Sequence, residues 1–206
     1  MSIQRFFCPF PAQQIAFVHE QVEIALNDVL VLIDDPSRSG VYWSLSSGTG
    51  RIYSVMMAGE PPDEKVLRYN GFAVEKPTRL GQHPEHLTSD ESADPDPEAG
   101  KFGGAFRLHW PPITEEDHEK NMRDRAQAII GEAQSSVFTD RPVIMAVSGL
   151  SLAHHDSAVG MLALKRLGVI TEDDIGTLIR RTGNDFWPIV YDEYTTIMDH
   201  PELFRR

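Results

Sequence analysis

The stretch that decides the fold is residues 141–168, RPVIMAVSGLSLAHHDSAVGMLALKRLG. Residues 143–147 form a short apolar run between Pro142 and a Ser-Gly pair, which is typical of a buried strand that ends in a turn. Ser151 is expected to cap the helix that follows, and Gly168 is expected to end it. Because that helix is apolar nearly all round, we expect it to lie inside the protein. The stretch predicts a central strand and a buried helix joined by a tight turn.

Both helical and strand patterns occur in the rest of the chain. Apolar residues at helical spacing, with residues that cap or end helices, predict further helices over residues 12–34, 63–75, 114–133, 171–181 and 188–198. Runs rich in β-forming residues predict further strands over residues 41–45, 51–57 and 103–110. The first two strands are joined by a glycine loop, which indicates a hairpin. The end of the first helix, residues 29–33, fits a strand equally well, and Pro77 is expected to end the second helix.

This order of elements predicts an α+β fold, in which helices flank a small, mainly antiparallel sheet. Residues 12–168 form the expected core domain, preceded by an arm over residues 1–11 and followed by a C-terminal helical extension over residues 169–206. Within the core, residues 82–101 are acidic, contain prolines and have few large apolar side chains. Such a composition cannot bury enough surface to offset the entropy of ordering, so these residues predict a flexible loop.

The composition limits the classes of function. The chain has 206 residues and a formal net charge of −12, which disfavours direct binding to nucleic acid or to an anionic membrane. No apolar run reaches membrane-spanning length, and the first residues lack the pattern of a secretory signal. The one cysteine, Cys8, excludes an internal disulfide and fits a reducing compartment. We therefore expect a cytoplasmic protein.

Aromatic residues near both ends of the chain predict self-association. Phe6, Phe7 and Phe10 lie in the arm, and Phe186 and Trp187 lie beside the last predicted helix. A monomer would leave part of this apolar surface exposed, so we expect a homo-oligomer.

His154, His155 and Asp156 form the most chemically distinctive group, at the start of the buried helix. A neutral imidazole binds haem iron or a divalent metal ion, and a nearby carboxylate orients it. Consecutive side chains on a helix point in different directions, so a single site is not expected to use both histidines. The alternative is a polar first helical turn with no ligand.

Other chemical patterns are incomplete. His118 would complete a metal site with His154 or His155, although it fits the rim of the core as well. Ser148 stands between a strand and a helix, as some nucleophiles do, but the first glycine of the GxSxG pattern is missing, which favours an ordinary turn. Gly103 and Gly104 either allow a close approach to a ligand or mark the start of a strand.

Three segments, which follow one another along the chain in the same order as in the family, resemble the GlcG/HbpS-like haem-binding family. They are residues 50–59, residues 73–76 with Lys76 on a helix, and residues 146–149 followed by Asp156. The chain departs from the family pattern in having serine at the first hairpin turn and an extra helix between the last two strands. The resemblance implies a profilin-like fold, assembly into oligomers and binding of a small ligand, with haem as the candidate. It transfers no catalytic residue.

These observations give a leading hypothesis and two alternatives. The leading hypothesis is a non-enzymatic protein that binds a small ligand, such as haem. The expected ligand-binding residues are Lys76, Gly103, Gly104, Ser148, Gly149, His154, His155 and Asp156. One alternative is a metal-dependent enzyme that uses His118 with His154 or His155. The other is an acidic interaction or inhibitor protein that acts on a basic macromolecular partner.

Overall fold

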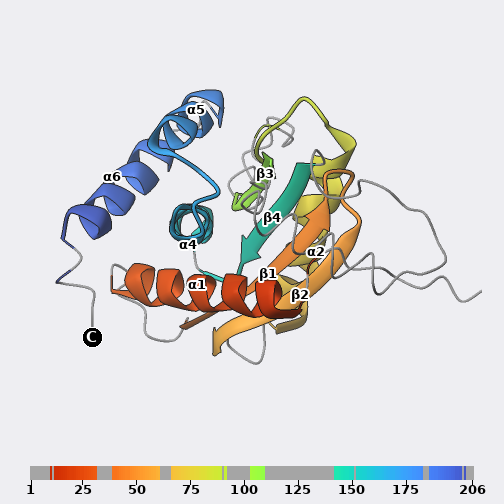
Figure 1. Cartoon of the computed structure of the whole chain (residues 1–206), viewed down its shortest axis with the longest axis horizontal. Helices are drawn as coiled ribbons and strands as arrows, with labels where there is room; N and C mark the ends of the chain where they lie inside the picture. Colours follow the sequence, from red (N-terminus) through yellow and green to blue (C-terminus); the bar gives the residue numbers. More distant parts are fainter. Residues whose placement is uncertain are drawn as a thin grey trace, which may run out of the picture.

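The computed structural model describes residues 10, 12–31, 39–60, 66–89, 91, 103–109, 142–150, 152–182, 186–200 and 202. The elements, in chain order, are α1 (Ala12–Leu30), β1 (Ser39–Ser47), β2 (Ile52–Glu60), α2 (Val66–Gln82), β3 (Ala105–His109), β4 (Pro142–Ser148), α4 (Ala153–Arg166), α5 (Glu172–Thr182) and α6 (Phe186–Asp199). The helices and the four-stranded sheet confirm the predicted α+β class (Figure 1). Within these described ranges, no helix has both the length and the apolar character needed to cross a bilayer.

The sheet has the strand order β2-β1-β4-β3, and every neighbouring pair is antiparallel. The predicted hairpin is present as β1 and β2, and β4 is an inner strand, as its apolar sequence predicted. Trp43 of β1 lies opposite Met56 of β2 on one side and Val147 of β4 on the other. The two inner strands come from distant parts of the chain, because Ser46 pairs with Ile144, 98 positions further on.

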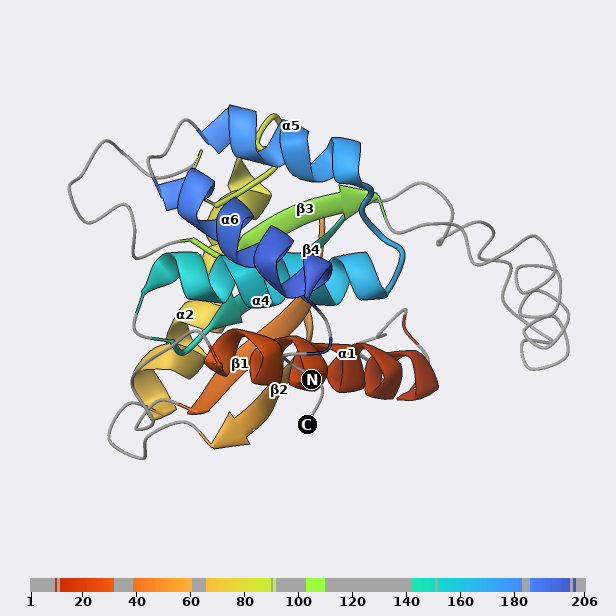
Figure 2. The ribbon, with the colours of Figure 1, turned by 90° about the vertical axis from the view of Figure 1, so that its left-hand side faces the viewer.

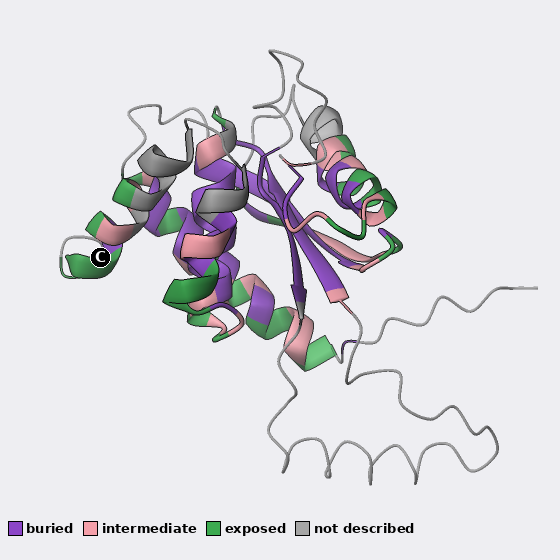
Figure 3. Ribbon diagram, turned by 90° about the horizontal axis from the view of Figure 1, so that it is seen from above, coloured by how far each residue is buried: buried purple, intermediate pink, exposed green. Residues whose placement is uncertain are grey.

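Helices cover both faces of the sheet. Helix α2 contacts all four strands from one side, whereas α1 and α4 pack together against the other side (Figure 2). Helix α6 packs on α4, on the side away from the sheet. Successive side chains of β4 point to opposite faces of the sheet. Met145 and Val147 belong to the large core with α1 and α4, whereas Ile144 and Ala146 form a smaller cluster with Leu80 of α2. Buried residues therefore line both sides of the sheet (Figure 3).

Helix α2 continues through Pro77, so the prediction that this proline ends the helix is wrong. Proline has no N–H group, and at position 77 it cannot donate to the carbonyl oxygen of Ala73, one helical turn earlier. The hydroxyl group of Ser44 in β1 donates to that oxygen instead, over 2.5 Å, and both residues are buried. A side chain from the sheet thus replaces the hydrogen bond that the proline removes.

Gly168 lies just after the C-terminal end of α4, where the sequence predicted that the helix ends. Its φ angle is 68°, a conformation that glycine adopts without steric cost. Its N–H group donates to the carbonyl oxygen of Lys165, and the N–H group of Val169 donates to that of Leu164. This pair of hydrogen bonds is the Schellman motif, which satisfies the last carbonyl groups of a helix.

The first part of the predicted flexible loop, residues 82–101, is attached to the sheet. The N–H group of Ser89 donates to the carbonyl oxygen of Ala105 over 3.1 Å, and Thr88 forms a bridge with Phe106 of β3. Residues 88 and 89 therefore pair with the strand β3, whereas the flexibility of the loop stays a prediction. Residues 90 and 92–101 lie outside the described part of the chain.

Phe10 is buried, and its ring lies edge-on to that of Tyr53 at 6.2 Å, so it is not the exposed aromatic residue that we expected. Several other predictions concern groups that the structure does not describe. These are the arm residues Phe6 and Phe7, the end of the first helix beyond residue 31, the helix over 114–133 with His118, and the side chains of Phe186 and Trp187. The N-cap position of α4 is Leu152, without a side-chain capping hydrogen bond, so the prediction that Ser151 caps this helix is wrong.

Candidate functional site

The residues predicted to bind a ligand separate into two groups in the structure. Lys76, Gly104 and Asp156 meet at the end of β4, beside Ser148 and Gly149, and we call this group the sheet-end junction. His154 and His155 instead face helix α6. Gly103 is buried next to the junction. The two groups have different chemical properties.

The sheet-end junction is a buried ion pair that links helices on opposite faces of the sheet. The ammonium group of Lys76 in α2 donates to the carbonyl oxygen of Val147 over 2.7 Å and to Oδ2 of Asp156 in α4 over 3.3 Å. The N–H group of Leu150 donates to Oδ1 of Asp156 over 3.0 Å. Burial raises the pKa of the Asp156 carboxyl, and the charge of Lys76 acts in the opposite direction. Each charged group therefore has partners within the protein.

Gly104 is needed for this close packing. A Cβ atom at position 104 would lie 2.9 Å from the carbonyl oxygen of Val147 and 3.0 Å from Cβ of Asp156. Gly149 is similarly close to β1, since a Cβ there would lie 2.6 Å from the carbonyl oxygen of Gly40. These glycines let segments of the protein approach one another. The junction, whose Ser148 is also buried, thus has the character of a structural element.

His154, His155 and Glu193 form a second group between α4 and α6, which we call the α4–α6 cluster. Oε1 of Glu193 lies 3.8 Å from Nε2 of His154 and 3.5 Å from Nε2 of His155. The two imidazole rings meet edge to face, with centroids 4.2 Å apart. The carboxylate of α6 therefore reaches both rings, and the expectation that a single ligand site would use only one of them stays a prediction.

Two buried atoms of the α4–α6 cluster have no hydrogen-bond partner among the described residues. They are Nδ1 of His155 and Oε2 of Glu193. The side chains are 8 % and 19 % exposed, respectively. A buried polar atom without a partner costs about 1–3 kcal/mol, so a group of such atoms indicates a bound species or a functional role.

The electrostatic environment keeps His154 in its neutral form. Burial lowers the pKa of His154, the neighbouring His155 lowers it further, and Glu193 opposes these effects. A histidine must be neutral to bind a metal ion through its ring nitrogen. The cluster is therefore suited to metal binding at neutral pH.

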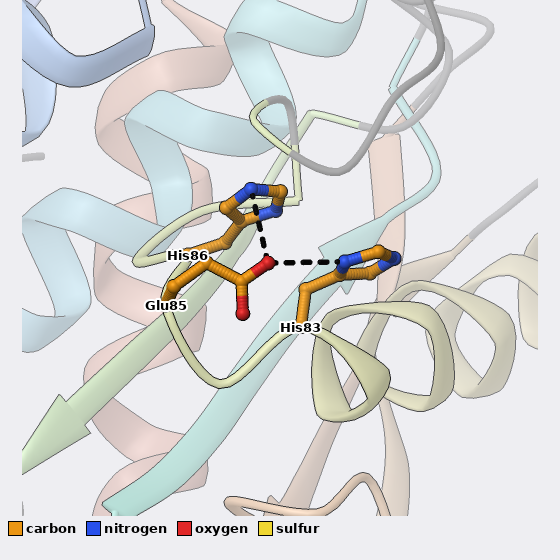
Figure 4. Close-up of side chains that lie close together, drawn as sticks. All are labelled: His83, Glu85 and His86. Atoms are coloured by element: carbon orange, nitrogen blue, oxygen red, sulfur yellow. Dashed lines mark hydrogen bonds and ion pairs between the residues drawn. The ribbon is translucent and has the colours of Figure 1, made fainter.

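A third group, the loop cluster, consists of His83, Glu85 and His86 in the segment that follows α2 (Figure 4). One ligand atom from each of these residues lies within 4.8 Å of the others, and the same holds for the α4–α6 cluster. The loop cluster was not predicted from the sequence, although the close spacing of two histidines around a glutamate is a signal. Glu193 carries no comparable local signal, because only the packing of α6 on α4 brings it to the histidines.

Comparison of the chain with protein-family models, with curated proteins and with solved structures finds no match. The resemblance to the haem-binding family accordingly stays a prediction. A function must therefore be inferred from the geometry of the side-chain clusters.

Proposed function

We propose that this protein binds a divalent transition-metal ion at the α4–α6 cluster, through His154, His155 and Glu193. The observation that carries the proposal is the approach of the Nε2 atoms of two imidazoles to one carboxylate oxygen, with all three side chains less than one-fifth exposed. This is a specific form of the small-ligand binding that the sequence predicted. It involves no catalytic step.

The distances support a metal ion of the size of zinc. Zinc binds imidazole nitrogen and carboxylate oxygen at about 2.0–2.2 Å, and tetrahedral geometry then places ligand atoms about 3.3–3.5 Å apart. The distances from Oε1 of Glu193 to the two Nε2 atoms are 3.5 and 3.8 Å. Small side-chain rotations would bring all three atoms onto one ion.

The types of ligand define the class of ion. Imidazole suits zinc, copper, nickel and cobalt, whereas calcium and magnesium prefer ligand sets made of oxygen atoms. Three protein ligands leave one tetrahedral position for water. We therefore expect zinc or a similar ion to be preferred over calcium and magnesium.

Haem fits this cluster poorly. An axial histidine must present its ring nitrogen to the open face of a porphyrin. Here the Nε2 atoms of both histidines face Glu193, and α6 lies over them. A porphyrin would have to displace this helix, whereas a single ion fits between the side chains.

Titration of chelator-treated protein with zinc tests the proposal. The two readouts are the heat of binding and the temperature of thermal unfolding. We expect zinc to raise the unfolding temperature of the wild type, because the ion binds only the folded cluster. The variants His155→Ala and Glu193→Gln should show a smaller increase, because each removes one ligand of the α4–α6 cluster. His200→Ala is the matched control, since His200 lies 3.4 Å from Glu202 in an exposed pair that belongs to neither histidine cluster. An equal increase in all four proteins would overturn the proposal.

The homo-oligomer predicted from the aromatic residues also stays a proposal. Phe10 no longer supports it, because its ring is buried within the chain. The exposed side chains of Phe17 in α1 and Met57 in β2 leave apolar surface that a second copy would cover. Light scattering of the metal-free and zinc-loaded protein would measure the oligomeric state in both forms.

A further inference from the structure

The loop cluster lies where the chain leaves α2 and turns back toward β3. Nδ1 of His83 lies 3.3 Å and Nε2 of His86 lies 3.6 Å from the same atom, Oε1 of Glu85. The two rings are nearly parallel, with centroids 4.9 Å apart and 11° between their planes. Figure 4 shows the carboxylate reaching both imidazoles. The three side chains thus converge on one point.

Arg107 of β3 holds the backbone of this cluster in place. Its Nε donates to the carbonyl oxygen of His86 over 2.9 Å, and its Nη2 donates to that of His83 over 3.0 Å. The same guanidinium donates to the carbonyl oxygens of Leu80 and Gly48. Arg107 is buried, so one fixed side chain organises both histidines. Ligands held in place before binding lose less conformational entropy when they bind.

The side chains of the loop cluster are open to solvent, in contrast to those of the α4–α6 cluster. The exposed fractions are 44 % for His83, 61 % for Glu85 and 23 % for His86. Water or a donor atom of another molecule can therefore occupy the remaining coordination positions of an ion. Sites with an open position exchange their outer ligands, as catalytic zinc sites do.

The charges around the loop cluster balance one another in part. The carboxylate of Glu85 attracts both histidines and Arg107, and it offers the negative charge that a cation needs. Because Arg107 competes for that charge, an ion should bind here less tightly than at the α4–α6 cluster.

We infer that His83, Glu85 and His86 bind a second divalent transition-metal ion, with water completing its coordination. The inference does not depend on the proposed function, because the two clusters share no residue. Each imidazole contributes one ring nitrogen and Glu85 contributes one carboxylate oxygen. The ion is accessible to solvent and exchanges readily.

The stoichiometry of zinc binding tests this inference. We expect two zinc ions per chain in the wild type and one in His83→Ala, His86→Ala and Glu85→Gln. These variants should keep the fold, because Arg107 binds backbone carbonyl groups, which the substitutions leave unchanged. His200→Ala should still bind two ions. In addition, Co²⁺ should broaden the NMR signals of both loop imidazoles, and His83→Ala should abolish the broadening at His86.

The two sites have separable outcomes. One ion in the wild type that is lost in His155→Ala but retained in His83→Ala overturns this inference and supports the proposed function. One ion that is lost in His83→Ala but retained in His155→Ala supports this inference and overturns the proposed function. An unchanged zinc stoichiometry in all three loop variants also overturns the inference.

Discussion

Replacement of Lys76 should destabilise this protein strongly. Its ammonium group is the cationic partner of the buried Asp156 carboxylate. Removing one partner of a buried ion pair typically costs about 3–5 kcal/mol, because a charge then stays buried without compensation. We predict a loss of about 3 kcal/mol in the free energy of unfolding for Lys76→Met, measured in urea. The loss should shrink in acid, where Asp156 becomes protonated.

The matched control is Lys165→Met, which removes the more exposed pair between Lys165 and Glu172. Exposed pairs contribute about 0–1 kcal/mol, so this variant should remain close to the wild type in stability. Equal losses in the two lysine variants would show that the buried pair has no special role.

His154 should make the metal-free protein sensitive to mild acid. Its pKa is lowered in the folded state by burial and by His155, against the opposing charge of Glu193. The unfolded chain therefore binds a proton at His154 at a higher pH, near the ordinary value of about 6.5. The stabilising contribution of the neutral ring is complete above that pH and decreases as the pH falls below it. Urea unfolding across this range should show a smaller decrease in His154→Asn than in the wild type.

At the scale of elements, α2 depends on a hydroxyl group from β1. Ser44→Ala should leave the carbonyl oxygen of Ala73 buried without its donor, at a cost of about 1–3 kcal/mol. In a Pro77→Ala background, the restored N–H group can donate to the same oxygen, so the Ser44→Ala substitution should cost less. Urea unfolding of the four proteins in a double-mutant cycle measures this coupling. If Ser44→Ala lowers the free energy of unfolding equally in both backgrounds, the hydroxyl group of Ser44 does not replace the hydrogen bond that Pro77 removes.

Some elements are encoded by local sequence signals, whereas others depend on residues far apart in the chain. The strand β4 and the end of α4 at Gly168 were predicted correctly, because an apolar run and a glycine are local signals. Pro77 misled the prediction, because the compensating hydroxyl group lies 29 positions from Ala73 in the chain. The α4–α6 cluster was predicted only in part for the same reason. Both histidines were identified, but Glu193 reaches them only through the packing of one helix on another.

At the scale of the whole molecule, the sheet lies between two helical layers, with a large core on one face and a smaller buried cluster on the other. The sheet-end junction joins α2 to α4 across the end of β4, and the α4–α6 cluster joins α4 to the next layer. A metal ion at that cluster would therefore stabilise the attachment of α6 to the core. The Lys76–Asp156 pair should be unaffected by the metal, because its partners lie within the junction.

The pairing of β1 with β4 has a consequence for how the chain folds as it is made. Ser46 leaves the ribosome 98 positions before its partner Ile144. At synthesis rates of about 5–20 residues per second, one edge of the newly formed hairpin waits about 5–20 s for the strand that covers it. An uncovered strand edge is a template for pairing with other chains. The nascent protein is thus most open to misassembly, or to capture by a chaperone, along the inner edge of β1.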